Sequence, residues 1–378
     1  MDREVGHIPS WAHAEALRFE SMRGEPRLTA TWDLARRLEE AGDLEAKFEI
    51  MQMILSVAGK QGRLDHSLRA FAEMRRIYQS DVRFRHLRKY VLWYYKWIVD
   101  ALPEYAEVTA ETIGQVFQDM EAFYRSEGES LRPVYGLRCQ AAVCMGHREA
   151  ASEWFEKWQA EPTGKSDDCR ACELDREIRY LLFLERTEDA MRVAEPILKL
   201  KVYCKDTPRT WTRLVGAAMQ LDQKKVAWVF SRISQRKVRK VPSMVASVAS
   251  QAVYQTFFAN KTRARRLAFL ALRRLQDTRN DVDRFAVYRS CGLWAAITTV
   301  LDPSAVGLPA SAFPASSDDG KKFIALPDIA SQCLANATEI ASGLDRRNGS
   351  THYADRLGEL EAAIRRVIEH MDSKRRTS

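Results

Sequence analysis

Three of the seven cysteines have a spacing that suits a metal site. Cys169 and Cys172 are separated by two residues, and Cys204 follows 32 residues after Cys172. A helix that begins near Cys172, reverses near Arg186 and Thr187 and returns would have two arms of about 20 Å each. The end of the second arm then lies beside the start of the first. The sequence therefore predicts that the three thiols meet at one end of a helical hairpin.

Three converging thiols allow more than one chemistry. They can bind a structural zinc ion, with Asp167, Asp168 or Asp206 as the fourth ligand. They can also remain a local thiol cluster, or form a reversible Cys169–Cys172 disulfide. A catalytic zinc is not indicated, because the chain has no histidine-rich ligand set and no HExxH motif. No cofactor is required by the sequence, and structural zinc stays one of the open alternatives.

A second feature is an unusual concentration of positive charge. Residues 223–276 contain thirteen Lys or Arg and no Asp or Glu, where the average composition would give about seven acidic residues. The other 324 residues carry 46 basic against 51 acidic residues, so this segment accounts for the net charge of +8. The candidate anion- or partner-binding residues are Arg236, Lys237, Arg239, Lys240, Lys261, Arg263, Arg265, Arg266, Arg273 and Arg274.

These cations form two clusters, each placed where a predicted helix ends or begins. Such clusters can bind the phosphates of a nucleic acid, another polyanion or an acidic protein. The alternative is that they only solvate helix faces and helix C-termini. Aromatic residues interleave with the cations, and at helical spacing most of them are expected in the core rather than stacked on bases. These aromatic residues are Trp228, Phe230, Tyr254, Phe257 and Phe258.

The remaining sequence gives little sign of catalysis. It has no glycine-rich phosphate loop, no GxSxG motif and no kinase motifs, so an enzyme is not expected. The aromatic run from Tyr90 to Trp97 could line a peptide groove, but such a run is more typical of a helix buried between neighbours. Trp93 and Trp97 are one turn apart and share a face.

The elements that must position these residues read as helices throughout. Apolar residues recur with a period of 3.6, and Gly (17) and Pro (12) are few, so the predicted class is all-α. From residue 131 the helices form pairs whose first members begin near residues 131, 172, 208, 242 and 281. Spacings of 34 to 41 residues favour a tetratricopeptide (TPR)-like right-handed solenoid of antiparallel helical pairs over a closed bundle.

Several motifs occur in an order that resembles a widespread group of bacterial TPR-repeat proteins with no assigned function. The resemblance covers roughly residues 30–220 and implies a TPR-like fold without an activity. The motifs that carry it are Leu92-Trp93-Tyr94-Tyr95-Lys96-Trp97-Ile98-Val99, Asp119-Met120-Glu121 with Tyr124-Arg125, Ser130-Leu131-Arg132-Pro133-Val134-Tyr135, Glu153-Trp154-Phe155-Glu156-Lys157-Trp158, Asp168-Cys169-Arg170-Ala171-Cys172, and Ala194-Glu195-Pro196-Ile197-Leu198 with Cys204 downstream.

The chain divides by pattern into four parts. Residues 1–130 form an N-terminal helical region, 131–301 a TPR-like array that includes the basic segment, 302–326 a flexible loop, and 327–378 a C-terminal helical pair. We expect no membrane span and no signal peptide, because no run of about 18 apolar residues and no basic-then-apolar N-terminus is present. The expected location is the cytoplasm.

The function expected first is a non-enzymatic scaffold that binds a protein or peptide partner on a concave surface. The expected groove residues lie on first helices of the pairs: Arg138, Arg179, Arg213 and Tyr254. The first alternative is a helical-repeat protein that binds nucleic acid through the basic segment. The second is a peptide-responsive regulator, in which the N-terminal helices dock on the array and the loop at 302–326 acts as a hinge.

Overall fold

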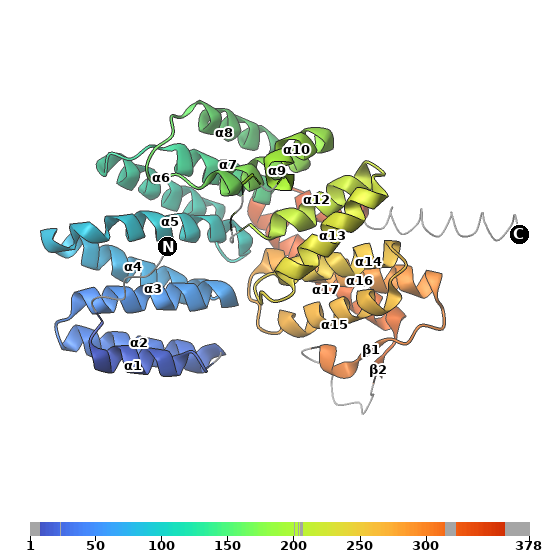
Figure 1. Ribbon diagram of the computed structural model, residues 1–378, viewed down its shortest axis with the longest axis horizontal. Helices are drawn as coiled ribbons and strands as arrows, with labels where there is room; N and C mark the ends of the chain where they lie inside the picture. The colour runs from blue at the N-terminus through green and yellow to red at the C-terminus, as the bar shows by residue number, and fades with distance from the viewer. Residues whose placement is uncertain are drawn as a thin grey trace, which may run out of the picture.

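The computed structural model describes residues 8–22, 24–199, 201–202, 204, 207–313 and 323–359. Nearly all of them lie in helices or in the short turns between helices, which confirms the all-α class (Figure 1). Among the described helices, none combines the length and the apolar character that a membrane span requires.

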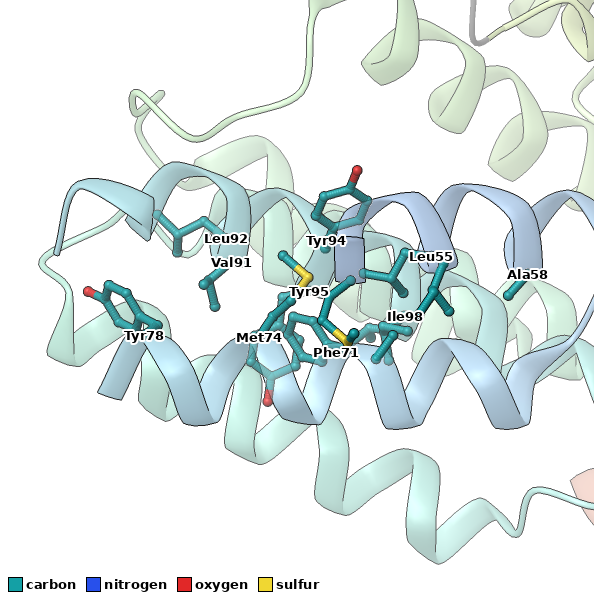
Figure 2. Close-up of a cluster of buried hydrophobic side chains, with 14 of the residues drawn as sticks. Leu55, Ala58, Phe71, Met74, Tyr78, Val91, Leu92, Tyr94, Tyr95 and Ile98 are labelled. Atoms are coloured by element: carbon teal, nitrogen blue, oxygen red, sulfur yellow. The ribbon is translucent and has the colours of Figure 1, made fainter. Parts of the chain in front are cut away.

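The first part of the chain is a stack of consecutive helices. Each α-helix packs on the next along the chain, from α1 to α6, as the left side of Figure 1 shows. The elements are α1 (Ser10–Phe19), α2 (Gly24–Glu40), α3 (Leu44–Gln61), α4 (Leu64–Ser80), η1 (Val82–Leu87), α5 (Arg88–Ala101), η2 (Leu102–Glu104) and α6 (Ala110–Ser126). Figure 2 shows the interior, where side chains of α3, α4 and α5 meet.

The aromatic run on α5 is divided between core and surface. Tyr94 and Tyr95 are buried, and Tyr95 packs against Phe71 of α4 with ring centroids 4.8 Å apart. Trp93 and Trp97 share the outer face, 38% and 44% exposed. Most of the run therefore serves the core, because α5 lies between α4 and α6.

The second part continues with helices joined by short turns. The helices are α7 (Arg132–Met145), α8 (Arg148–Ala160), α9 (Arg170–Phe183), α10 (Thr187–Val193), α11 (Glu195–Leu198), α12 (Arg209–Gln220), α13 (Lys224–Val238), α14 (Val245–Phe257), α15 (Lys261–Leu275) and α16 (Asp281–Leu301). Consecutive helices pack on each other, α7 on α8, α9 on α10, α12 on α13 and α14 on α15, and α14 also packs closely on α16. The five first helices begin within three residues of the predicted starts.

One turn geometry recurs between the two helices of each of these pairs. The first or second residue after the first helix has a positive φ in all four cases, at Gly146 (82°), Glu185 (62°), Asp222 (54°) and Ala259 (56°). The next amide donates to the carbonyl five residues earlier at 2.8–2.9 Å, which is the Schellman helix ending. Three of the four residues lack the freedom of glycine, so packing of the pairs, rather than local preference, holds this conformation.

The C-terminal part closes back on the first half of the chain. β1 (Leu308–Pro309), η3 (Ala310–Ala312) and β2 (Phe323–Ile324) lead into α17 (Leu326–Asn348), and residues 352–359 are helical. The segment expected as a loop therefore contains a short antiparallel strand pair, with residues 314–322 outside the described part. Arg347 of α17 donates hydrogen bonds to the carbonyls of Pro103 (2.6 Å), Tyr105 (2.8 Å) and Val108 (2.8 Å). The second helix of the predicted C-terminal pair lies mostly outside the described residues.

The core is distributed along the chain. Three clusters of buried apolar side chains follow one another, the first from α1 to α7, the second from α7 to α13, and the third from α13 to residue 353.

Candidate functional site

The two predicted basic clusters lie side by side because of how α13, α14 and α15 pack. α14 contacts both α13 and α15, which brings the end of α13 next to the beginning of α15. Two adjoining hollows of about 1070 and 480 Å³ lie there and share Gln235, Arg239, Asn260 and Arg263. We call them together the basic groove. Its cationic lining residues are Arg232, Arg236, Arg239, Lys240, Lys261, Arg263, Arg265 and Arg266.

The groove gathers seven of the ten predicted basic residues. Lys237 and Arg273 are not among its lining residues, although both belong to the same helices. Arg274 has a structural role, since its guanidinium donates to the carbonyls of Arg239 (2.8 Å) and Val241 (3.4 Å) at the α13–α14 connection. The side chain of Arg274 therefore fixes the backbone at Arg239, which is one of the groove-lining residues.

Two of the cations are already held by the segment after α16. Lys261 Nζ lies 3.0 Å from Asp302 Oδ2, and Arg265 donates to the carbonyl of Gly307 at 2.7 and 3.1 Å. Asp302 is the one carboxylate among the residues that line the two hollows. These contacts position the rim and leave the rest of the groove with an uncompensated positive charge.

Five cations of the groove have no such contact. Within the described parts of the chain, the structure gives no hydrogen bond or ion pair for five exposed side chains: Arg236, Arg239, Lys240, Arg263 and Arg266. Most exposed arginines of the first half are paired instead, as Arg36 is with Asp33 and Glu40. The groove thus concentrates cationic donors that are available to an external anion.

The start of α15 adds to this positive field. A helix N-terminus carries a partial positive charge, so acidic side chains stabilise its first turn and basic ones destabilise it. The first turn of α15 has no acidic residue and carries Lys261 and Arg263, while Asn260 caps it by accepting from the Arg263 amide at 3.3 Å. An anion bound at this end would remove the unfavourable interaction.

An aromatic ring completes the lining. Trp228 is 46% exposed, and the Arg232 guanidinium lies 4.8 Å from the centre of its ring. Phe230 is buried on the opposite side of α13, as expected for a core residue, and Tyr254 and Phe258 are half-buried. Periodicity alone could not single out Trp228, because its exposure depends on what α13 packs against.

The four predicted groove residues lie on α7, α9, α12 and α14, where they are half-buried and do not form one open site. Arg138 lies 3.3 Å from Glu121 and 4.7 Å from the Trp154 ring centre, and Arg213 pairs with Asp175. The Tyr254 hydroxyl lies against Gly216 of α12. Arg179 has no hydrogen bond or ion pair within the described residues and feels the charges of Glu104, Asp175 and Asp283.

A set of buried charged side chains from distant segments of the chain was not predicted from the sequence. Glu104 of η2 and Asp283 of α16 lie near Arg179 of α9 and near Arg209 and Arg213 of α12. Burial, together with the nearby charge of Asp283, raises the pKa of Glu104 to about 7. No local sequence pattern indicates this set, because Glu104 and Asp283 are far apart along the chain and meet in the folded structure.

This pKa predicts an unusual dependence of stability on pH. A carboxyl whose pKa is higher in the folded than in the unfolded chain binds its proton more tightly when folded, so the free energy of unfolding falls as pH rises from about 4.5 to 7. We expect Glu104→Gln to raise the free energy of unfolding by about 1–3 kcal/mol at pH 8 and to leave it nearly unchanged at pH 4.5. Urea unfolding at the two pH values measures this difference. Glu107→Gln, an exposed neighbour, is the control, and an equal effect at both pH values would contradict the interpretation.

The three thiols meet as the hairpin geometry predicts. The Sγ atoms of Cys169, Cys172 and Cys204 all lie within 4.8 Å of one another. Of the three expected fourth ligands, Asp168 is held by Lys96 (2.7 Å) and Arg176 (2.9 Å).

Asp167 accepts from the Gly164 amide at 2.8 Å, and it does not belong to the metal-ligand group. Asp206 lies outside the described residues. The structure therefore supports the convergence of the thiols but assigns neither Asp167 nor Asp168 to them.

Comparison with known proteins does not assign the chain to a family. No family model matches the chain, and no curated protein is similar to it. The resemblance to bacterial TPR-repeat proteins therefore stays a prediction.

Proposed function

We propose that this chain is a non-enzymatic binding protein, a TPR-like right-handed solenoid whose basic groove holds a single-stranded nucleic acid in the cytoplasm. The observation that carries the proposal is the set of five exposed cations in the groove with no partner among the described residues. Evenly paired surface charge would suit a structural role, whereas unpaired guanidinium groups around a hollow suit the binding of phosphates.

The recurrent helix ending supports the solenoid. The left-handed residues Gly146, Glu185, Asp222 and Ala259 are 39, 37 and 37 residues apart, close to the spacing of two-helix repeats. In such an array α13 and α15 are the second helices of adjacent pairs. The basic groove then lies along these two second helices, and its larger hollow extends to α16 and the segment 302–309.

The lining favours nucleic acid over an acidic polypeptide. Six of the eight cations are arginines, whose planar forks match phosphate oxygens and stack on flat rings. Trp228 offers an exposed face on which a base can stack, and only unpaired bases expose such faces. An acidic peptide has carboxylates for the arginines but no flat ring for Trp228.

The lining also favours binding without chemistry. The residues around the two hollows include no histidine and no cysteine, and their one carboxylate, Asp302, is paired with Lys261. Neither an acid–base pair nor a nucleophile is therefore placed next to the proposed ligand.

A peptide on the inner side of the array is the second candidate. Arg179 favours it, because this inner guanidinium has no hydrogen bond or ion pair within the described residues. The neighbouring Arg138 and Arg213 are satisfied by Glu121 and Asp175, so less of the inner surface is available than the sequence suggests.

A competition experiment separates the two polyanions. A fluorescein-labelled 20-nucleotide single-stranded RNA is titrated with the full chain at low salt, and unlabelled poly-glutamate or unlabelled RNA is then added. We expect sub-micromolar binding, displacement by RNA at least tenfold more efficient than by poly-glutamate, and a loss of about 1–3 kcal/mol in Trp228→Ala. Equal displacement and no effect of Trp228→Ala would contradict the nucleic-acid assignment in favour of an acidic protein partner.

A further inference from the structure

The cysteine cluster lies at the start of α9, far from the basic groove along the chain. Cys169 is the N-cap residue of α9, Cys172 is in its first turn, and Cys204 precedes α12. The sulfur atoms of Cys169 and Cys172 are 3.5 Å apart, and those of Cys172 and Cys204 are 3.7 Å apart. Three thiols from two separate segments thus face one point.

These distances separate a disulfide from an arrangement of unbonded sulfur atoms, which a metal ion can bridge. A disulfide needs sulfur atoms about 2.05 Å apart. Three thiolates on a tetrahedral zinc ion, each about 2.3 Å from the metal, lie about 3.8 Å from one another. The two distances between neighbouring sulfur atoms, 3.5 and 3.7 Å, are close to the second value and far from the first.

Burial and the neighbouring thiols raise the pKa of Cys172, and two groups near the cluster act against this rise. The N-terminus of α9 presents its partial positive charge to both Cys169 and Cys172, which stabilises thiolates. The Arg176 guanidinium, one turn further along α9, interacts with the Cys172 sulfur. Arg176 is itself held in place by Asp168, which explains why this carboxylate is not available as a ligand.

We propose that Cys169, Cys172 and Cys204 bind one Zn²⁺ ion. The three thiol protons are released to solvent as the ion binds. Within the described residues no fourth histidine, cysteine or carboxylate belongs to the group. The ion fastens the segment before α12 to the start of α9. It therefore fixes where α12, with Arg209 and Arg213, enters the array, and this role is independent of the proposed nucleic-acid binding.

The metal content of the purified full-length chain tests the proposal. Inductively coupled plasma mass spectrometry should find about one zinc ion per chain after growth with zinc and removal of loosely bound metal. Cys172→Ser and Cys204→Ser should each reduce this content at least tenfold. Cys144→Ser is the matched control, because Cys144 lies on α7 beside Tyr353 and outside the cluster. Far-UV circular dichroism verifies that each variant is folded.

A second measurement keeps the proposal testable if a variant fails to fold. Co²⁺ added to the reduced, metal-free wild-type chain should produce the thiolate charge-transfer absorption and the intense d–d bands of tetrahedral cobalt, and added Zn²⁺ should abolish them. Wild-type chain that binds neither metal would overturn the proposal. So would a Cys169–Cys172 disulfide found by peptide mass spectrometry after the thiols are alkylated at lysis.

Discussion

Replacing Arg236, Arg239 and Arg263 together with glutamine should weaken the binding of single-stranded RNA at least 100-fold at low salt. Each of these guanidinium groups faces the basic groove without a partner among the described residues. A charge-assisted contact to a phosphate contributes about 1–1.5 kcal/mol, so three such contacts contribute about 3–4 kcal/mol. Fluorescence anisotropy with labelled RNA measures the loss.

A matched variant controls for net charge. Arg18, Lys60 and Arg346 are exposed and lie on α1, α3 and α17, away from the groove. Changing all three to glutamine removes the same charge and should weaken binding less than threefold. The groove variant should also unfold at the wild-type urea concentration, because the replaced side chains make no contacts that fold the chain. Equal losses in the two variants would show that binding follows net charge rather than the groove.

Replacing Asp168 with asparagine should lower the free energy of unfolding by about 3–5 kcal/mol. Asp168 Oδ1 accepts from Lys96 Nζ at 2.7 Å, and Oδ2 accepts from Arg176 Nη2 at 2.9 Å. The three side chains are only 5%, 11% and 12% exposed, for Lys96, Asp168 and Arg176 respectively. The amide would leave two cations in the interior with no anion between them, and removal of one partner from such a cluster is strongly destabilising.

The effect of replacing Asp168 on the free energy of unfolding should also depend on pH. Burial alone would raise the pKa of Asp168, but the charges of Arg176 and Lys96 hold it below its usual value. Its contribution is therefore complete above about pH 4 and is lost as pH falls through the lowered pKa. Urea unfolding from pH 7 to pH 3 should show a smaller acid-induced loss in Asp168→Asn than in wild type.

An exposed ion pair serves as the control. Glu153 and Lys157 of α8 are 61% and 46% exposed, so Glu153→Gln should change the free energy of unfolding by no more than about 0.5 kcal/mol. A loss below about 1 kcal/mol in Asp168→Asn would mean that solvent screens the three charges, which would contradict the interior ion cluster.

The helices and the convergence of local motifs were predictable from the sequence. The starts of α7, α9, α12, α14 and α16 follow from apolar periodicity, which depends on neighbouring residues only. The meeting of the three thiols follows from the length of one hairpin. The two basic clusters were predicted where helices end or begin, and they meet because α14 packs between α13 and α15.

What the sequence could not predict depends on contacts between distant segments. Asp168 looked like a metal ligand because it precedes Cys169, yet its partner Lys96 lies 72 residues away. The raised pKa of Glu104 arises from burial and from the charge of Asp283, which lies on the distant helix α16. Trp228 is 46% exposed because of how α13 packs in the fold. Periodicity carries no information on any of these contacts.

The salt dependence of binding tests the central claim most directly. The logarithm of the association constant for single-stranded RNA is plotted against the logarithm of salt concentration, for the wild-type chain and for the variant that lacks Arg236, Arg239 and Arg263. Each phosphate contact contributes about −0.7 to the slope, so five available cations predict about −3.5 for wild type and about −1.4 for the variant. A wild-type slope near zero, or the same slope in both chains, would contradict a phosphate-binding groove at α13 and α15.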